Sequence, residues 1–129
     1  MSDIESRAIC RYWIETEGQS FNPLSSTLVF QLIFTPRMNI KQDKVVIRQN
    51  EEKLSKVLDI YKKRLKEARF LAGVKFSLAD VSHLPNTQYL VNDTDKGNLF
   101  TSRENVGRWW DEISSQDSWK KVVDLRKGA

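Results

Sequence analysis

The chain is poor in the residues that carry most protein chemistry, with one cysteine and one histidine among 129 residues. A lone Cys10 excludes an internal disulfide, which fits a reducing compartment such as the cytosol. Structural metal sites need several Cys or His ligands, so we expect no metal, and His83, inside an apolar helical pattern, is interpreted as a structural residue. Cys10 as a nucleophile would need a base, and its neighbours Arg7 and Arg11 are not bases.

Long apolar runs and targeting patterns are also missing. The most apolar stretch, residues 28–34, is far shorter than the ~20 residues that span a bilayer. The first residues lack the basic-then-apolar pattern of a secretory signal. We therefore expect a cytosolic protein without a membrane partner.

The excess of positive charge is small, with 21 basic and 17 acidic residues and a net charge of +4. Such a charge could attract an anionic partner. Most lysines, however, fall on one solvated helix face, and the chain shows no zinc-finger spacing, RNP motif or basic run interleaved with aromatics. We therefore expect no nucleic-acid partner.

What the sequence does contain is helical periodicity, clearest over residues 44–68. Apolar residues hold one face at spacings of three and four, while lysines lie largely off that face. These residues are Leu54, Val57, Leu58, Tyr61, Leu65 and Ala68. With the weaker patterns before and after it, this helix predicts an all-α fold of about five helices.

Helix-start signals place the other elements. Ser2 and Glu5 form a capping box, and Asn22-Pro23 reads as a second start, although residues 24–34 leave a strand possible. Pro36 is expected at or just past the end of that element. Towards the C-terminus, Ser102 is expected to cap one helix and Asp117 or Ser118 the last, with residues 126–129 loose.

Ser77 and Asp80 give the most explicit of these signals, an S-x-x-D capping box flanked by Phe76 and Val81 at the positions of a hydrophobic staple. We expect the helix that follows to reach about residue 91 with a kink at Pro85. The segment before the box contains Gly73 as a turn residue, and residues 92–97 read as a loop.

Two groups of residues are candidates for ligand binding. Glu5 and Ser6 fall in the first turn of a helix, where free amides attract a carboxylate and a glutamate could hold an ammonium group. The residues alone favour the simpler interpretation that Glu5 completes the box with Ser2. Phe21, Phe30 and Phe34 are either core, which is the default, or the wall of an apolar pocket.

Several stretches together resemble the glutathione S-transferase superfamily, specifically its plant phi class. The resemblance covers nearly the whole chain, and its most specific part is the FSLAD block followed by HLPN. The FNP segment points to the phi class. The similar stretches are ESRAI, WIETEGQSFNPLSSTLVFQLIF, EEKLSKVLDIYKKRL, RFLAGVKFSLADVSHLPNTQYL, VGRWWDEISS and SWKKVV.

The resemblance implies an all-α helical bundle of the transferase C-terminal type over residues 13–129, preceded in residues 1–12 by a remnant of the last helix of the glutathione-binding domain. Pro23 would then be a kink inside a long helix that begins near Trp13. Glu5 and Ser6 match the residues that grip the γ-glutamyl end of glutathione. Phe30 and Phe34 match the wall of the pocket for hydrophobic electrophiles.

The same resemblance implies glutathione as co-substrate, no separate cofactor, a possible homodimer and a cytosolic location. In the family a thioredoxin-like domain with the catalytic serine and a cis-proline precedes ESRAI, whereas this chain begins four residues before Glu5. Tyr12 runs directly into Trp13, as loss of a coding block would produce. We therefore expect a truncated transferase with little or no activity. The alternatives are a non-catalytic hydrophobic-ligand-binding module and a protein-interaction module.

Overall fold

The computed structural model describes residues 3–128, and the side chains of residues 4–125. Over that range the fold is all-α, without a named strand, as the sequence predicted; an isolated bridge pairs Phe70 with Gly73. The box expected at Ser2 lies outside the described residues. The helical segments are α1 Asp3–Thr16, η1 Glu17–Phe21, α2 Asn22–Val29, η2 Phe30–Phe34, α3 Thr35–Arg37, α4 Lys44–Glu67, α5 Leu78–Val81, α6 Leu84–Asn92, α7 Asn98–Thr101, α8 Glu104–Ser114 and α9 Asp117–Gly128.

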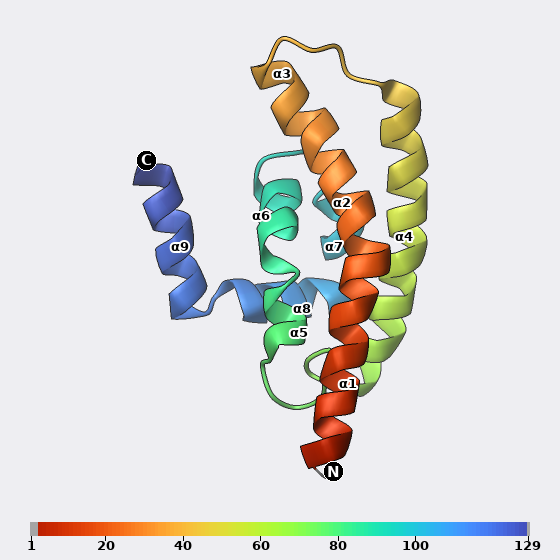
Figure 1. Ribbon diagram of the computed structural model, residues 1–129, viewed down its shortest axis with the longest axis vertical. Helices are drawn as coiled ribbons and strands as arrows, with labels where there is room; N and C mark the ends of the chain where they lie inside the picture. Colours follow the sequence, from red (N-terminus) through yellow and green to blue (C-terminus); the bar gives the residue numbers. More distant parts are fainter. Residues whose placement is uncertain (1–2, 129) are drawn as a thin grey trace.

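The first five segments, α1 to α3, form one continuous helix from Asp3 to Arg37, which rises from the N-terminus at the bottom to α3 at the top of Figure 1. The predicted helix start at Asn22 and the alternative strand are therefore both wrong. A helix that passes through Pro23 agrees with the family resemblance, but it begins at Asp3 and not near Trp13. The predicted end at Pro36 is correct to within one residue.

Two single π-helical turns explain how this helix tolerates its prolines. The segment η1 directly precedes Asn22-Pro23, and the Asn22 N–H donates to the carbonyl of Glu17, five residues back. The segment η2 precedes Thr35-Pro36 in the same way, with the Thr35 N–H bonded to Phe30. A proline in a regular helix lacks one donor and collides with the carbonyl four residues back. A wider turn before it shifts that bonding pattern, so the helix continues.

Helix α4 matches its prediction to within one residue. Asp43 caps it, because one carboxylate oxygen accepts from the backbone N–H groups of Val45 and Val46 at 3.1 and 3.2 Å. Its predicted apolar face is buried at Leu54, Leu58, Tyr61 and Leu65. This face packs against α2 and α8, and the lysine-bearing face is exposed.

The second half of the chain is more broken than its pattern predicted. The single helix expected over residues 77–91 is two helices, α5 and α6, separated by Ser82 and His83. Pro85 does not kink a helix but lies in the first turn of α6, where a missing N–H removes no helical bond. The loop predicted over residues 92–97 is present, with Asn92 as the last residue of α6.

The C-terminal boundaries also differ from prediction. Ser102 ends α7, a short helix that was not expected, and Arg103 precedes α8. Asp117 is the first residue of α9 and not its cap, and the helix continues through Gly128. The expectation of a loose end is thus wrong for the backbone of residues 126–128, and Ala129 lies outside the described residues.

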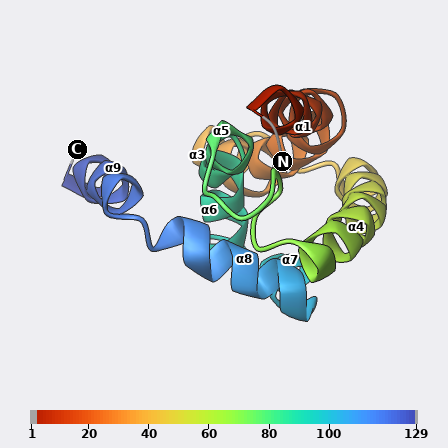
Figure 2. The ribbon, with the colours of Figure 1, turned by 90° about the horizontal axis from the view of Figure 1, so that it is seen from below.

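The core lies between the long N-terminal helix, α4, α6 and α8. Its centre is aromatic, and the Tyr61 ring makes edge contacts with Trp13 and Trp109 at centroid distances of 5.3 and 6.2 Å. Helix α9 stands away from this body in two perpendicular views (Figures 1 and 2). Among the hollows at the surface, one lies beside the start of α1 and another beside α9.

Candidate functional site

Glu5 and Ser6 are exposed near the start of α1, and Ser6 lines a cleft of about 630 Å³. The cleft lies between α1, the end of α4 and the segment of residues 72–77 that leads into α5. Ser77, the first residue of the capping box, lines it too. The structure therefore brings together two residues that the sequence separated by 71 positions.

The cleft combines positive charge with small polar groups. Arg64 and Lys75 supply the cations and Glu67 one carboxylate, with the Cys10 thiol and the serine hydroxyls between them. Arg64 is held in place because its Nε donates to the Leu71 carbonyl at 2.8 Å. A fixed guanidinium beside hydroxyl donors suits a ligand carboxylate.

Phe30 and Phe34 lie much further along the same helix. Phe30 is 43% exposed, and the Phe34 ring centre lies 5.8 Å from that of Tyr89. Ser6 and Phe30 are 24 residues apart on one uninterrupted helix, which is about 36 Å at 1.5 Å per residue. The structure thus does not bring the two predicted ligand sites together. Phe21, the third member of the aromatic stripe, is fully buried and belongs to the core.

The capping box at the start of α5 is present and reaches deeper than a cap requires. Asp80 is fully buried, and its Oδ2 accepts from the Ser77 N–H at 3.0 Å. Its Oδ1 accepts from the Leu71 N–H at 3.2 Å and from the Trp109 indole N–H at 2.8 Å. Burial raises the pKa of Asp80 although these donors oppose the shift. One carboxylate therefore ties the loop before α5 to α8.

His83 is fully buried beside this group, as expected of a structural histidine. One ring nitrogen lies 2.8 Å from the Tyr61 hydroxyl and the other 2.7 Å from the Ala79 carbonyl. Since a carbonyl only accepts, Nδ1 carries the proton and Nε2 accepts from Tyr61. Burial lowers the pKa of His83 to about 3 and raises that of Tyr61.

Among the described residues, no group of three His, Cys, Asp or Glu side chains is arranged to hold a metal ion. Within the same residues, no helix is long and apolar enough to cross a bilayer.

Comparison with known proteins decides the family. A family model described as the glutathione S-transferase C-terminal domain matches residues 21–117. The chain belongs to the glutathione S-transferase family. Its relatives place it in the phi class: glutathione S-transferase F11 of Arabidopsis thaliana is 41% identical over 95% of this chain, and a Hyoscyamus muticus glutathione S-transferase is 37% identical over 98%.

Solved glutathione transferases share the fold in detail. Glutathione transferase F2 of Populus trichocarpa is 66% identical, with a TM-score of 0.95 over all of this chain. A maize glutathione S-transferase I, solved with an atrazine glutathione conjugate, is 32% identical, with a TM-score of 0.92 over 97% of it. The match covers 60% of the poplar chain and 57% of the Arabidopsis F11 protein, so this chain spans a little over half of its relatives' length.

Sequence reasoning missed the cations of the cleft and the more distant partners of Asp80, which are Leu71 and Trp109. Arg64 belongs to a helix whose pattern indicated only a buried apolar face, and Lys75 belongs to a loop without periodicity. Trp109 lies 29 residues from Asp80. No pattern within either segment indicates such a contact, because it depends on how the helices pack.

Proposed function

We propose that these 129 residues form the helical half of a phi-class glutathione transferase and that they conjugate glutathione poorly or not at all on their own. The main support for poor activity is the distance between Ser6 and Phe30, which is about 36 Å along one helix. An extended tripeptide spans only about 11 Å, and reacting atoms must approach to roughly 3–3.5 Å. One copy of this chain therefore cannot hold both substrates at these residues for reaction.

The chemistry of thiol activation supports the same proposal. A free thiol with a pKa near 8.5 is mostly protonated at neutral pH, so a transferase must stabilise the thiolate. The described groups with strongly shifted pKa values, such as Tyr61 and His83, are fully buried and bonded to each other. They cannot reach a bound thiol.

A conjugation assay with a chromogenic aromatic electrophile tests this proposal on the purified 129-residue chain. The poplar transferase F2, assayed in parallel, is the matched control because its fold covers this whole chain. We expect no rate above the uncatalysed reaction. A rate within tenfold of the control would overturn the proposal.

We further propose that the cleft beside α1 binds glutathione weakly, through a carboxylate held by Ser6 and Arg64, and that Phe30 and Phe34 contact hydrophobic electrophiles. Titration calorimetry with glutathione tests the first part. The variant Arg64→Met should reduce binding, whereas Lys62→Met, on the exposed side of the same helix, should not. Equal affinities would contradict the assignment.

The single cysteine and the family support a cytosolic location.

A protein-interaction role is the second candidate, because an apolar surface is exposed near the start of α1. Ile4, Val74 and Leu78 are 80%, 78% and 68% exposed, and α1 contacts α5 at that end of the molecule. Clustered apolar side chains of this kind mark association surfaces. We propose that they form a contact with a second protein chain, such as a homodimer partner. Size-exclusion chromatography with light scattering tests this, and a monomer at high concentration would contradict it.

A further inference from the structure

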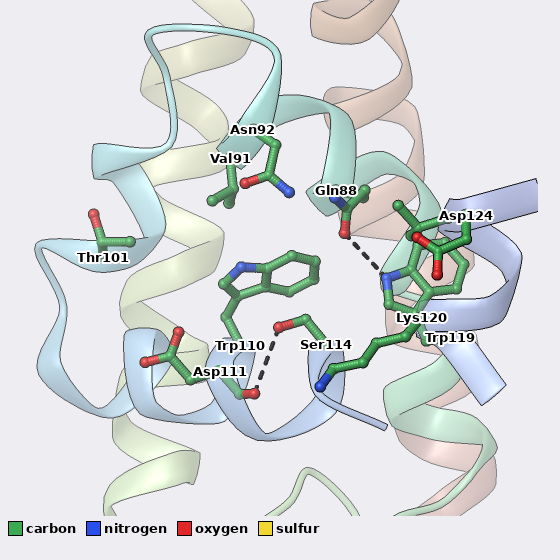
Figure 3. A pocket seen from close by; sticks show the side chains of 11 residues that line it. Gln88, Val91, Asn92, Thr101, Trp110, Asp111, Ser114, Trp119, Lys120 and Asp124 are labelled. Carbon is green, nitrogen blue, oxygen red and sulfur yellow. Dashed lines mark hydrogen bonds between the residues drawn. The ribbon is translucent and has the colours of Figure 1, made fainter. Parts of the chain in front are cut away.

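A second hollow, separate from the cleft at Ser6, lies between α6, α8 and α9 (Figure 3). Its volume is about 510 Å³, which falls within the range of small-molecule sites. It exists because α9 stands away from the body. The Trp119 indole N–H bridges to Gln88 on α6 at 3.0 Å and closes one end.

That bridge fixes the orientation of the Gln88 amide. An indole N–H can only donate, so the atom it contacts is the amide oxygen, and the amide NH₂ takes the other position. Gln88 is only 8% exposed and lines the hollow. Among the described residues this NH₂ has no acceptor, so the hollow has a hydrogen-bond donor in its wall.

Trp110 supplies a second inward donor. Its side chain is 4% exposed, and Figure 3 shows the indole nitrogen on the edge of the ring below Val91 and Asn92, with the six-membered ring towards Gln88. The indole N–H of the neighbouring Trp109 donates to Asp80, but the Trp110 N–H has no acceptor among the described residues. Among the described residues, the Thr87 hydroxyl is the polar side-chain atom that is both fully enclosed and unpaired. The Trp110 nitrogen is also unpaired but is not fully enclosed, so its N–H is accessible from the hollow that Trp110 lines.

The walls and the rim complete the chemistry. Apolar contact comes from the two indoles and from Val91 and Val123, while Asp111 and Asp124 place carboxylates at the rim beside Lys120. The interior therefore offers two donors and flat apolar faces, with the Asn92 amide beside them, and the rim offers two carboxylates and one ammonium group. A complementary ligand is flat, carries an acceptor on its inner edge and presents hydroxyl or N–H donors outward.

We propose that this hollow binds neutral, planar aromatic carbonyl compounds that bear an outward hydroxyl or amino group. The carbonyl oxygen accepts from the Trp110 indole N–H. The ring system packs against the indoles, and the outer donor faces Asp111 or Asp124. None of the proposed substrate-binding residues lines this site; these are Glu5, Ser6, Phe30 and Phe34. A test of the site is therefore independent of glutathione binding.

The probe is 7-hydroxycoumarin, titrated calorimetrically into the full chain in mildly acidic buffer that keeps its phenol neutral. The control ligand is 2-naphthol, which has the same two-ring size and a hydroxyl but lacks the carbonyl. We expect saturable binding of the coumarin and roughly two- to tenfold weaker binding of the naphthol, the range of one hydrogen bond. Equal affinities, or no saturable binding of the coumarin, would overturn the proposal.

Variants locate the site. Val123→Trp fills the hollow and should abolish coumarin binding, whereas Val122→Trp, at the neighbouring half-exposed position outside the lining, should leave it unchanged. Trp110→Phe keeps an aromatic ring but removes the N–H, so it should weaken the coumarin roughly two- to tenfold and leave 2-naphthol unaffected. Unchanged coumarin binding in Val123→Trp would refute the location.

A measurement on the unmodified chain guards against variants that fail to fold. The four tryptophans give indole N–H signals in a ¹⁵N-correlated NMR spectrum. A new hydrogen bond should move the Trp110 signal most, while the Trp109 signal, already bonded to Asp80, should stay in place. A coumarin titration that leaves the Trp110 signal unmoved would overturn the proposed contact.

Discussion

Removing the Asp80 carboxylate should destabilise the fold far more than removing the hydroxyl that shares its capping box. In Asp80→Ala, the Leu71 N–H and the Trp109 indole N–H lose their acceptor, and both residues are fully buried. Each unsatisfied buried donor costs about 1–3 kcal/mol, and loss of the cap at Ser77 adds about 1 kcal/mol. The expected loss in free energy of unfolding is therefore about 3–7 kcal/mol.

Two matched variants separate these contributions. Ser77→Ala removes only a hydroxyl that lies 3.4 Å from Asp80 and keeps the backbone N–H of the box, so it should cost about 0.5–1 kcal/mol. Asp80→Asn keeps one carbonyl oxygen for Trp109 and Leu71 but turns an NH₂ towards the Ser77 N–H. Its loss should fall between the other two.

Urea unfolding, followed by tryptophan fluorescence and by circular dichroism, measures all three variants against the unmodified chain. Coincident transitions from the two probes would justify a two-state free energy. A loss for Asp80→Ala no larger than that for Ser77→Ala would refute the idea that one carboxylate joins the loop to α8. It would reduce the box to an ordinary local cap.

Three further predictions concern the same core. His83 has a pKa of about 3 in the folded chain, whereas in the unfolded chain it is protonated below about pH 6.5. Because only the unfolded chain takes up this proton between pH 7 and 5, the free energy of unfolding should fall by about 2 kcal/mol over that range. Urea denaturation at both pH values tests this. Tyr61→Phe removes the His83 contact and should cost about 1 kcal/mol in urea unfolding. Gly97→Ala places a Cβ 3.0 Å from the Val91 backbone and should lower the melting temperature.

Local patterns predicted the all-α fold and the elements that depend on neighbours in sequence. The spacing of Leu54, Leu58, Tyr61 and Leu65 defined α4 because one buried face is enough to specify a helix. The Ser77 box was visible because both of its partners lie within one turn. Predictions failed where proline was read alone. Pro23 lies inside a helix because of the turn before it, and Pro85 begins a helix because of the break before it.

The candidate sites were less predictable than the fold. Ser6 was identified, but Arg64 and Lys75, which share its cleft, lie 58 and 69 residues further along the chain. The distance between Ser6 and Phe30 depended on whether the helix breaks between them. Only the π-helical turns answer that question, and nothing in the spacing of apolar residues reveals them.

The strongest pKa shifts in this chain mark its scaffold and not a reaction centre. Shifted titratable groups in clefts are ordinarily candidates for catalysis, but His83, Tyr61 and Asp80 are fully buried, and each is bonded to groups that hold helices together. The cleft at Ser6 offers the reverse, with accessible charges and hydroxyls at the surface. Binding and stability thus reside largely in different residues, so substitutions at Arg64 should change ligand affinity and cost only the one hydrogen bond to the Leu71 carbonyl in stability. Substitutions at Asp80 should do the opposite.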